Sequence, residues 1–184
     1  MSSRYIVYIA MFAACSSSVV AHAEVKQSAP DHFVLEYTFT TKATPAKAYA
    51  DAVDVAHWWS ADHTYSGNAN NLSMAARAGG CFCEKLPGGG VQHMTVMLAM
   101  PGKLLRLAGG LGPLQAGALS ATLTFTFKPV ESGTAVNVSY VAAGYLEPGL
   151  DKVAGGVDHV LGEQVERLRQ LTEGLAPAAG KKKS

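Results

Sequence analysis

The sequence of 184 residues is poor in charge, since only 16% of its residues are Asp, Glu, Lys or Arg. Arg4 and the three terminal lysines, Lys181 to Lys183, supply four of its 15 basic residues. The rest of the chain, with 14 acidic residues, therefore carries a net charge of about −3. It contains no basic stripe, and clusters of Lys and Arg are what proteins use to bind phosphates. Nucleic acid is therefore not an expected partner.

Sequence signatures of catalysis are also missing. The chain has no nucleophile elbow, no phosphate-binding loop and no pair of suitably spaced carboxylates. The glycine-rich segment 109–113 is too irregular for a phosphate loop and is not followed by a helix, so it indicates a bend between strands. These absences favour a binding protein over an enzyme without deciding between them.

The N-terminal apolar segment, residues 5–14, is too short to span a membrane. It follows Arg4 and precedes Ala21-His22-Ala23, which has the small-residue pattern of a cleavage site. We therefore expect a signal peptide over residues 1–23 and a mature protein that begins at Glu24. The mature protein would be periplasmic or secreted and would have no transmembrane segment.

Lipid attachment at Cys15 is the alternative interpretation of this region. Residues 12–15 are close to a lipoprotein motif, but Phe12 is bulky where a smaller aliphatic residue is expected. Simple cleavage after Ala23 is therefore favoured.

The body of the chain combines one early helix, a series of strands and one long last helix. Thr44-Pro45 is typical of a helix start, and apolar residues recur at steps of three and four over residues 149–173. Alternation of apolar and polar residues predicts strands at 33–40, 71–74, 81–85, 91–99, 103–108, 121–127 and 134–143. Within the last helix, Gly155-Gly156 predicts either a close approach to the sheet or a kink.

This order indicates an α+β fold in which a curved antiparallel sheet of six to seven strands wraps around the C-terminal helix. We expect one domain over residues 32–174. It is preceded by an N-terminal extension at 24–31 and followed by a disordered basic tail at 175–184.

Several short motifs lie along this domain. They are Trp58-Trp59-Ser60, the segments 63–67, 71–73, 79–84, 105–107 and 111–114, Gly133-Thr134 and Gly144-Tyr145. With them the chain resembles the START-like (Bet v1-like, SRPBCC) superfamily, and within it the domains similar to the activator of Hsp90 ATPase. The resemblance covers about residues 32–173 and implies a helix-grip fold. A role on Hsp90 is not implied, because an exported chain would not meet a cytosolic chaperone.

Members of this superfamily bind lipids, polyketides, hormones or flavonoids, and some act as cyclases or hydratases. The resemblance therefore implies a cavity between sheet and C-terminal helix that takes a small apolar or amphipathic molecule. The expected lining consists of inward-facing strand and helix residues together with the aromatic cluster after the first helix. These residues are Tyr37, Trp58, Trp59, Tyr65, Phe82, Met94, Val96, Leu98, Leu123, Phe125, Phe127, Val153, Val157 and Leu161. Alternatively, at least one of the two tryptophans simply plugs the core.

Glu84 is the candidate catalytic residue. A carboxylate on a cavity-facing strand would have a raised pKa and could act as a general acid or base, with His63 assisting. The protein would then be a small cyclase, hydratase or hydrolase. In the alternative, Glu84 pairs with Arg106 or holds backbone groups of a loop.

Cys81, Cys83 and His93 form a candidate metal site, and with them the protein would be a module that binds metal or responds to redox conditions. If Leu86 faces Gly90 across the hairpin turn, these three side chains share the outer face of the sheet and could bind Zn or Cu. A shift of the strand pairing by one residue would separate these side chains. If no metal binds, both cysteines are ordinary strand residues without a ligand. A Cys81–Cys83 disulfide is not expected, because alternate residues of a flat strand have Cβ atoms roughly 6.5 to 7 Å apart. No other cofactor is expected.

Overall fold

The computed structural model describes residues 22–177. Residues 1–21 of the predicted signal peptide, Cys15 among them, and the last seven residues of the tail lie outside this range. The predicted cleavage point after Ala23 falls near the start of the first strand. Cleavage there would remove the first two residues of that strand.

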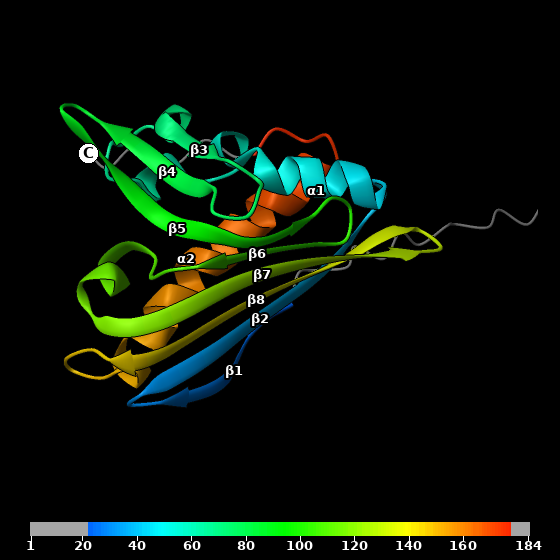
Figure 1. The fold of residues 1–184 in the computed structure, drawn as a ribbon. Coiled ribbons are helices and arrows are strands. Elements are labelled where there is room, and N and C mark those ends of the chain that lie inside the picture. Colours follow the sequence, from blue (N-terminus) through cyan, green and yellow to red (C-terminus); the bar gives the residue numbers. More distant parts are fainter. Residues whose placement is uncertain (1–21, 178–184) are drawn as a thin grey trace, which may run out of the picture.

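Eight antiparallel strands form one curved sheet (Figure 1). The strands are β1 (His22–Ala29), β2 (His32–Thr41), β3 (Leu72–Met74), β4 (Cys81–Leu86), β5 (Gly89–Met100), β6 (Leu104–Ala108), β7 (Ala118–Val130) and β8 (Gly133–Tyr145). Their order across the sheet is β1-β2-β8-β7-β6-β5-β4-β3. The seven predicted strands are present, and β1 is an additional strand in the segment expected to be an extension.

This part of the chain contains two α-helices: α1 (Pro45–Val53), which follows β2, and α2 (Leu150–Thr172), which follows β8. The predicted start of α1 is confirmed, since Thr44 Oγ1 accepts a hydrogen bond from the Lys47 backbone N–H at 3.3 Å. Short 3₁₀ turns lie at η1 (Val55–His57), η2 (Ala61–His63), η3 (Ala69–Asn71) and η4 (Gly112–Ala116). Within residues 22–177, no helix has both the length and the apolar character that crossing a membrane requires.

The core lies between α2 and the sheet, with α2 packing mainly against β1, β2, β8 and α1. Alternate residues of each long strand point inward, and one face of α2 meets them. The largest buried side chains include Phe33, Tyr37, Phe39, Trp58, Phe82, Phe125 and Tyr140. This packing confirms the predicted α+β helix-grip architecture.

Three β-bulges interrupt the regular pairing of the strands. On β1 the extra residue is Lys26, which lies between residues paired with Leu35 and Val34. On β5 the extra residues are His93, opposite the Phe82–Cys83 bond, and Met97, opposite the Arg106–Leu107 bond. An extra residue bends its strand and changes the face on which the following side chains lie. The two bulges of β5 therefore decide which of its side chains point inward.

Candidate functional site

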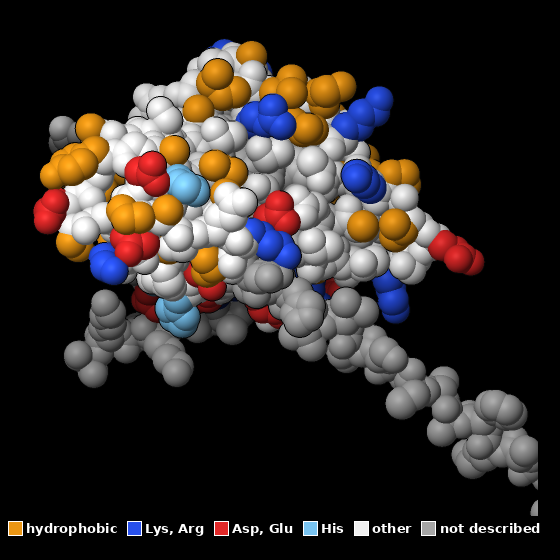
Figure 2. All heavy atoms as spheres, turned by 90° about the horizontal axis from the view of Figure 1, so that it is seen from below, with side chains coloured by type: hydrophobic (Ala, Val, Ile, Leu, Met, Phe, Trp, Pro, Cys, Tyr) orange, Lys and Arg blue, Asp and Glu red, His pale blue; other side chains and the backbone are white. Residues whose placement is uncertain are grey.

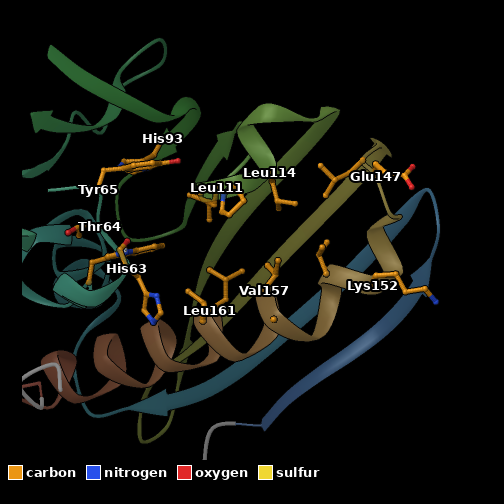
Figure 3. A pocket seen from close by; sticks show the side chains of 17 residues that line it. His63, Thr64, Tyr65, His93, Leu111, Leu114, Glu147, Lys152, Val157 and Leu161 are labelled. Carbon is orange, nitrogen blue, oxygen red and sulfur yellow. Dashed lines mark hydrogen bonds between the residues drawn. The ribbon is translucent and has the colours of Figure 1, made fainter. Parts of the chain in front are cut away.

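A partly open cavity of about 640 Å³ lies against the N-terminal half of α2 (Figure 3). Its floor is one face of α2, its opposite wall is the segment around η4, and residues 59–65 close one end. The walls are mainly apolar. The lining consists of Trp59, His63, Thr64, Tyr65, His93, Leu111, Gly112, Pro113, Leu114, Leu146, Glu147, Lys152, Val153, Gly156, Val157, Val160 and Leu161. A volume in this range suits a small organic molecule.

The apolar stripe of helix α2 has two adjoining parts. Its buried face points into the core and includes Leu150, Ala154, Val165 and Leu168. Its cavity face carries Val153, Gly156, Val157 and Val160 at steps of three and four residues. Periodicity in the sequence does not by itself distinguish a residue that packs in the core from one that borders an empty space.

The glycine pair of α2 does not approach the sheet. A Cβ atom added to Gly155 or Gly156 would meet no atom within 4 Å. The expected close approach is therefore wrong, and Gly156 instead leaves room in the floor of the cavity.

The wall around η4 is fixed from below by a buried tyrosine. The Leu111 backbone N–H donates a hydrogen bond to the Tyr140 hydroxyl at 3.2 Å. Burial raises the pKa of Tyr140 to about 12, so the hydroxyl stays neutral at physiological pH. Gly109 lies close to β5, where an added Cβ would be 2.9 Å from the carbonyl oxygen of His93. Only glycine suits this position, which also has a φ of 140°.

The closed end of the cavity is tied to α2 by polar contacts. The Ser60 backbone N–H donates to Gln164 Oε1 at 2.7 Å, and His63 Nε2 lies 3.3 Å from Glu163 Oε2. The indole N–H of Trp59 donates to the carbonyl oxygen of His63 at 3.0 Å. These contacts hold the aromatic cluster in place over the helix.

The predicted lining divides into two groups. The structure brings five of the predicted residues to the cavity: Trp59, Tyr65, Val153, Val157 and Leu161. Most of the others are packed into the core instead: Tyr37, Trp58, Phe82, Met94, Val96, Leu123, Phe125 and Phe127. The interior under the middle of the sheet is thus filled by the protein's own side chains, and the cavity lies at one end of it. Trp58, only 2% exposed, is the tryptophan that plugs the core.

Leu98 was expected on the inner face but is 38% exposed. The bulge at Met97 explains the difference, because one extra residue turns the next position to the outer face. The sequence also missed the wall formed by residues 111–114 and Leu146. The apolar pair Leu111 and Leu114 inside a glycine-rich bend was the available signal.

The predicted metal site is wrong. In the structure Leu86 pairs with Gly89 rather than Gly90, so Cys83 faces Gln92, and His93 points to the opposite, inner face. Cys81 and Cys83 form a disulfide with a Cα–Cα distance of 5.4 Å. The strand is contracted here, next to the bulge on β5, which brings the two side chains within reach. Among residues 22–177 no group of three or more His, Cys, Asp or Glu side chains could hold a metal ion.

Glu84 is buried, but its pKa is lowered rather than raised. Burial raises the pKa of Glu84, and hydrogen bonds from Ser66, Tyr65 and His93 outweigh this effect. The carboxylate accepts from the backbone N–H groups of Tyr65 at 3.1 Å and Ser66 at 2.5 Å. A carboxylate that is ionised at neutral pH and holds a loop is not a general acid, and this corrects the expectation of a raised pKa. The alternative of a carboxylate that holds loop backbone groups is the observed one.

The other expected partners of Glu84 bond elsewhere. Arg106 Nε donates to Thr124 Oγ1 at 3.1 Å, and His63 bonds to Glu163. Instead, Glu84 Oε2 lies 3.0 Å from His93 Nε2. The sequence had placed these two side chains on opposite faces of the hairpin.

No protein-family model matches the chain, and no curated protein matches it either. Solved structures do match its fold. A protein from Rhizobium leguminosarum has a TM-score of 0.57 at 16% identity, over 84% of this chain and 98% of that one. The Aha1 dimer from Colwellia psychrerythraea has a TM-score of 0.54 at 17% identity, over 76% and 96%. Ara h 8.0201 has a TM-score of 0.53 at 12% identity, over 77% and 97%.

At these identities the likeness concerns the fold alone. It agrees with the element order, the antiparallel sheet and the single long C-terminal helix described above. The chain therefore has a helix-grip fold, which agrees with the fold implied by the resemblance of its sequence motifs.

Proposed function

We propose that the protein is an exported binding protein whose cavity at α2 holds a small apolar or amphipathic molecule. The observation that carries the proposal is the partly open, mainly apolar cavity of about 640 Å³. Val153, Val157 and Val160 each expose apolar surface to this space, and a ligand would remove that surface from water.

Polar groups are confined to the two ends of the cavity (Figure 3). One end carries His63, Thr64, Tyr65 and His93, and the other carries Glu147 and Lys152. An apolar body in the middle with a polar group at one end matches this distribution. A long hydrocarbon without any polar group would leave the ends unused.

The surface gives no support to a nucleic-acid partner. On the face drawn in Figure 2, Lys and Arg side chains lie singly among acidic and hydrophobic ones. Affinity for nucleic acid depends on several cations that contact neighbouring phosphates.

Export is supported by the Cys81–Cys83 disulfide, because such bonds form and persist mainly in oxidising compartments. It is also supported by the signal-like sequence before Glu24. Fractionation of the native host tests this part of the proposal. The extracytoplasmic protein should begin at Glu24, and a protein found in the cytoplasm with residues 1–23 intact would contradict it.

The glycine pair of α2 offers a matched test of the binding site. Gly156→Leu places a side chain in the cavity, whereas Gly155→Leu places the same side chain on the neighbouring position, which does not line it. The probe is N-phenyl-1-naphthylamine, whose fluorescence rises in apolar surroundings. Binding should weaken about tenfold or more in Gly156→Leu and stay close to wild type in Gly155→Leu.

Two results would contradict the cavity as the site. One is the absence of probe binding to the wild-type protein, and the other is an equal effect of the two substitutions. Native mass spectrometry of the protein from its own host then identifies the natural ligand, which should be retained by wild type and lost from Gly156→Leu.

A further inference from the structure

The Glu84–His93 pair is the most unusual polar feature of the site. The Glu84 side chain has no exposed surface and that of His93 only 7%, yet both are ionisable. One carboxylate receives three donors: two backbone N–H groups of the Tyr65–Ser66 loop and Nε2 of His93 at 3.0 Å. A buried ionisable pair is costly unless its contacts stabilise it, and here the pair lies at the edge of the cavity.

The ionisation of Glu84 decides the tautomer of His93. Since the pKa of Glu84 is lowered, the group is a carboxylate at physiological pH and can only accept hydrogen bonds. His93 Nε2 must therefore carry the proton that it shares with Glu84. In the neutral imidazole, Nδ1 is then left with a free lone pair and acts as an acceptor.

The ring of His93 is held in one orientation by its neighbours. It lies at a tilt to the ring of Phe82, with ring centroids 4.9 Å apart, and to the ring of Tyr65, at 5.9 Å. Figure 3 shows Tyr65 and His93 side by side. The Nδ1 atom makes no hydrogen bond to the residues that the structure describes. In the part of the chain that the structure describes, the polar side-chain atoms that are both fully buried and unpaired are Tyr49 Oη and Ser60 Oγ. Nδ1 of His93 is not one of them. His93 is one of the residues that line the cavity.

From this geometry we infer that Nδ1 of His93, oriented by Glu84, accepts a hydrogen bond from a hydroxyl group of the bound molecule. The inference rests on the proposed function and names its ligand class: a neutral alcohol or phenol with an apolar body. A ligand carboxylate would offer no donor and would lie near the negative charge of Glu84. A ligand cation would lose its hydration against the apolar walls around Val157 and Leu114.

Two probes test this selectivity by fluorescence titration: 2-naphthol, which has a hydroxyl donor, and 2-methoxynaphthalene, in which a methyl group replaces the hydroxyl proton. Wild type should prefer 2-naphthol about fivefold to tenfold, as expected for one net hydrogen bond. His93→Phe keeps a flat ring but removes the acceptor, so it should bind both probes equally. The matched control is His57→Phe, an exposed histidine that does not line the cavity, which should keep the preference.

A second measurement does not depend on any variant or ligand. Nitrogen-15 NMR of the imidazole groups in the free wild-type protein should show His93 protonated at Nε2 and unprotonated at Nδ1. In Glu84→Gln the carboxylate is gone, so this tautomer should lose its dominance, and the preference for 2-naphthol should shrink with it.

The outcomes separate the inference from the proposed function. If wild type binds both probes equally tightly, or if His93 carries its proton on Nδ1, the inference is wrong while the cavity remains a binding site. If neither probe binds in the cavity, both proposals fall.

Discussion

The hydroxyl group of Tyr37 on β2 donates a hydrogen bond to the Asp158 carboxylate on α2 at 2.8 Å. Burial, the hydrogen bond and the charge of Asp158 together raise the pKa of Tyr37 well above its usual value. Asp158 follows Val157, which belongs to the cavity floor. The bond therefore holds this part of α2, and with it the cavity floor, at a fixed distance from β2.

Replacing Tyr37 by Phe should lower the free energy of unfolding by about 2 kcal/mol, because a bond to a charged acceptor is lost while the ring remains. Urea unfolding at neutral pH measures the change. Tyr145→Phe is the matched control: Tyr145 is 67% exposed and bonds to Glu147 at the surface, so its loss should cost less than about 0.5 kcal/mol. An equal effect of the two substitutions would show that the Tyr37–Asp158 bond does not hold the helix.

Phe125 was expected to line the cavity but is buried in the core, at 2% exposure and beside Trp58. Phe125→Ala should therefore destabilise the protein by about 3 to 5 kcal/mol, the cost of an empty space in a packed core. Val160→Ala, on the cavity floor, should cost less than about 1 kcal/mol, since it only enlarges a space that already exists. Thermal and urea unfolding of both variants provide the comparison. If Phe125→Ala costs as little stability as Val160→Ala, Phe125 borders the cavity rather than the packed core.

The Cys81–Cys83 disulfide predicts that neither thiol of the purified, unreduced protein reacts with iodoacetamide. After reduction both should react, and mass spectrometry counts the added groups. Because the bond closes a loop of only three residues, the Cys81→Ser, Cys83→Ser variant should lose at most about 1.5 kcal/mol of stability. Full alkylation of the native protein without reductant would contradict the disulfide.

The free energy of unfolding should decrease at acidic pH because Glu84 becomes protonated. Burial raises its pKa, but the bonds from Ser66, Tyr65 and His93 bring it below the ordinary value of 4.5. The unfolded chain therefore takes up the proton first as the pH falls. The contribution of Glu84 is complete above about pH 4.5 and is lost as the pH falls through the folded-state pKa.

Urea midpoints measured across this acid range test the sign of the effect. Wild type should lose stability more steeply than Glu84→Gln, which has no carboxylate to protonate at this position. Parallel curves for the two proteins would mean that Glu84 has the same pKa in the folded and unfolded states.

The architecture was predictable because each element has a local signal. The Thr44-Pro45 cap, the alternation in β7 and the period of α2 each depend on neighbouring residues only. The missed strand β1 shows the limit of such signals. Its sequence around Val25 and Gln27 is not clearly alternating, and its pairing with β2 gives it its structure.

The site was less predictable because it depends on single extra residues. One bulge moves His93 from the outer face to the inner face, where it meets Glu84, and a second turns Leu98 outward. Both changes follow from pairing between strands, which alternation within one strand does not reveal. Likewise, Val160 and Val165 look equivalent in the sequence of α2, although one borders the cavity and the other the core.

Strand β1 is the last strand on its side of the sheet and has a bulge at Lys26. A free sheet edge is a template on which a strand of another molecule can add, and long flat edges lead to aggregation. The bulge breaks the even spacing of backbone donors and acceptors along this edge, and the lysine brings a charge to the same point. On the opposite side the sheet ends in β3, which has only three residues. Both borders of the sheet are thus poor templates for strand addition, which disfavours polymerisation through either of them.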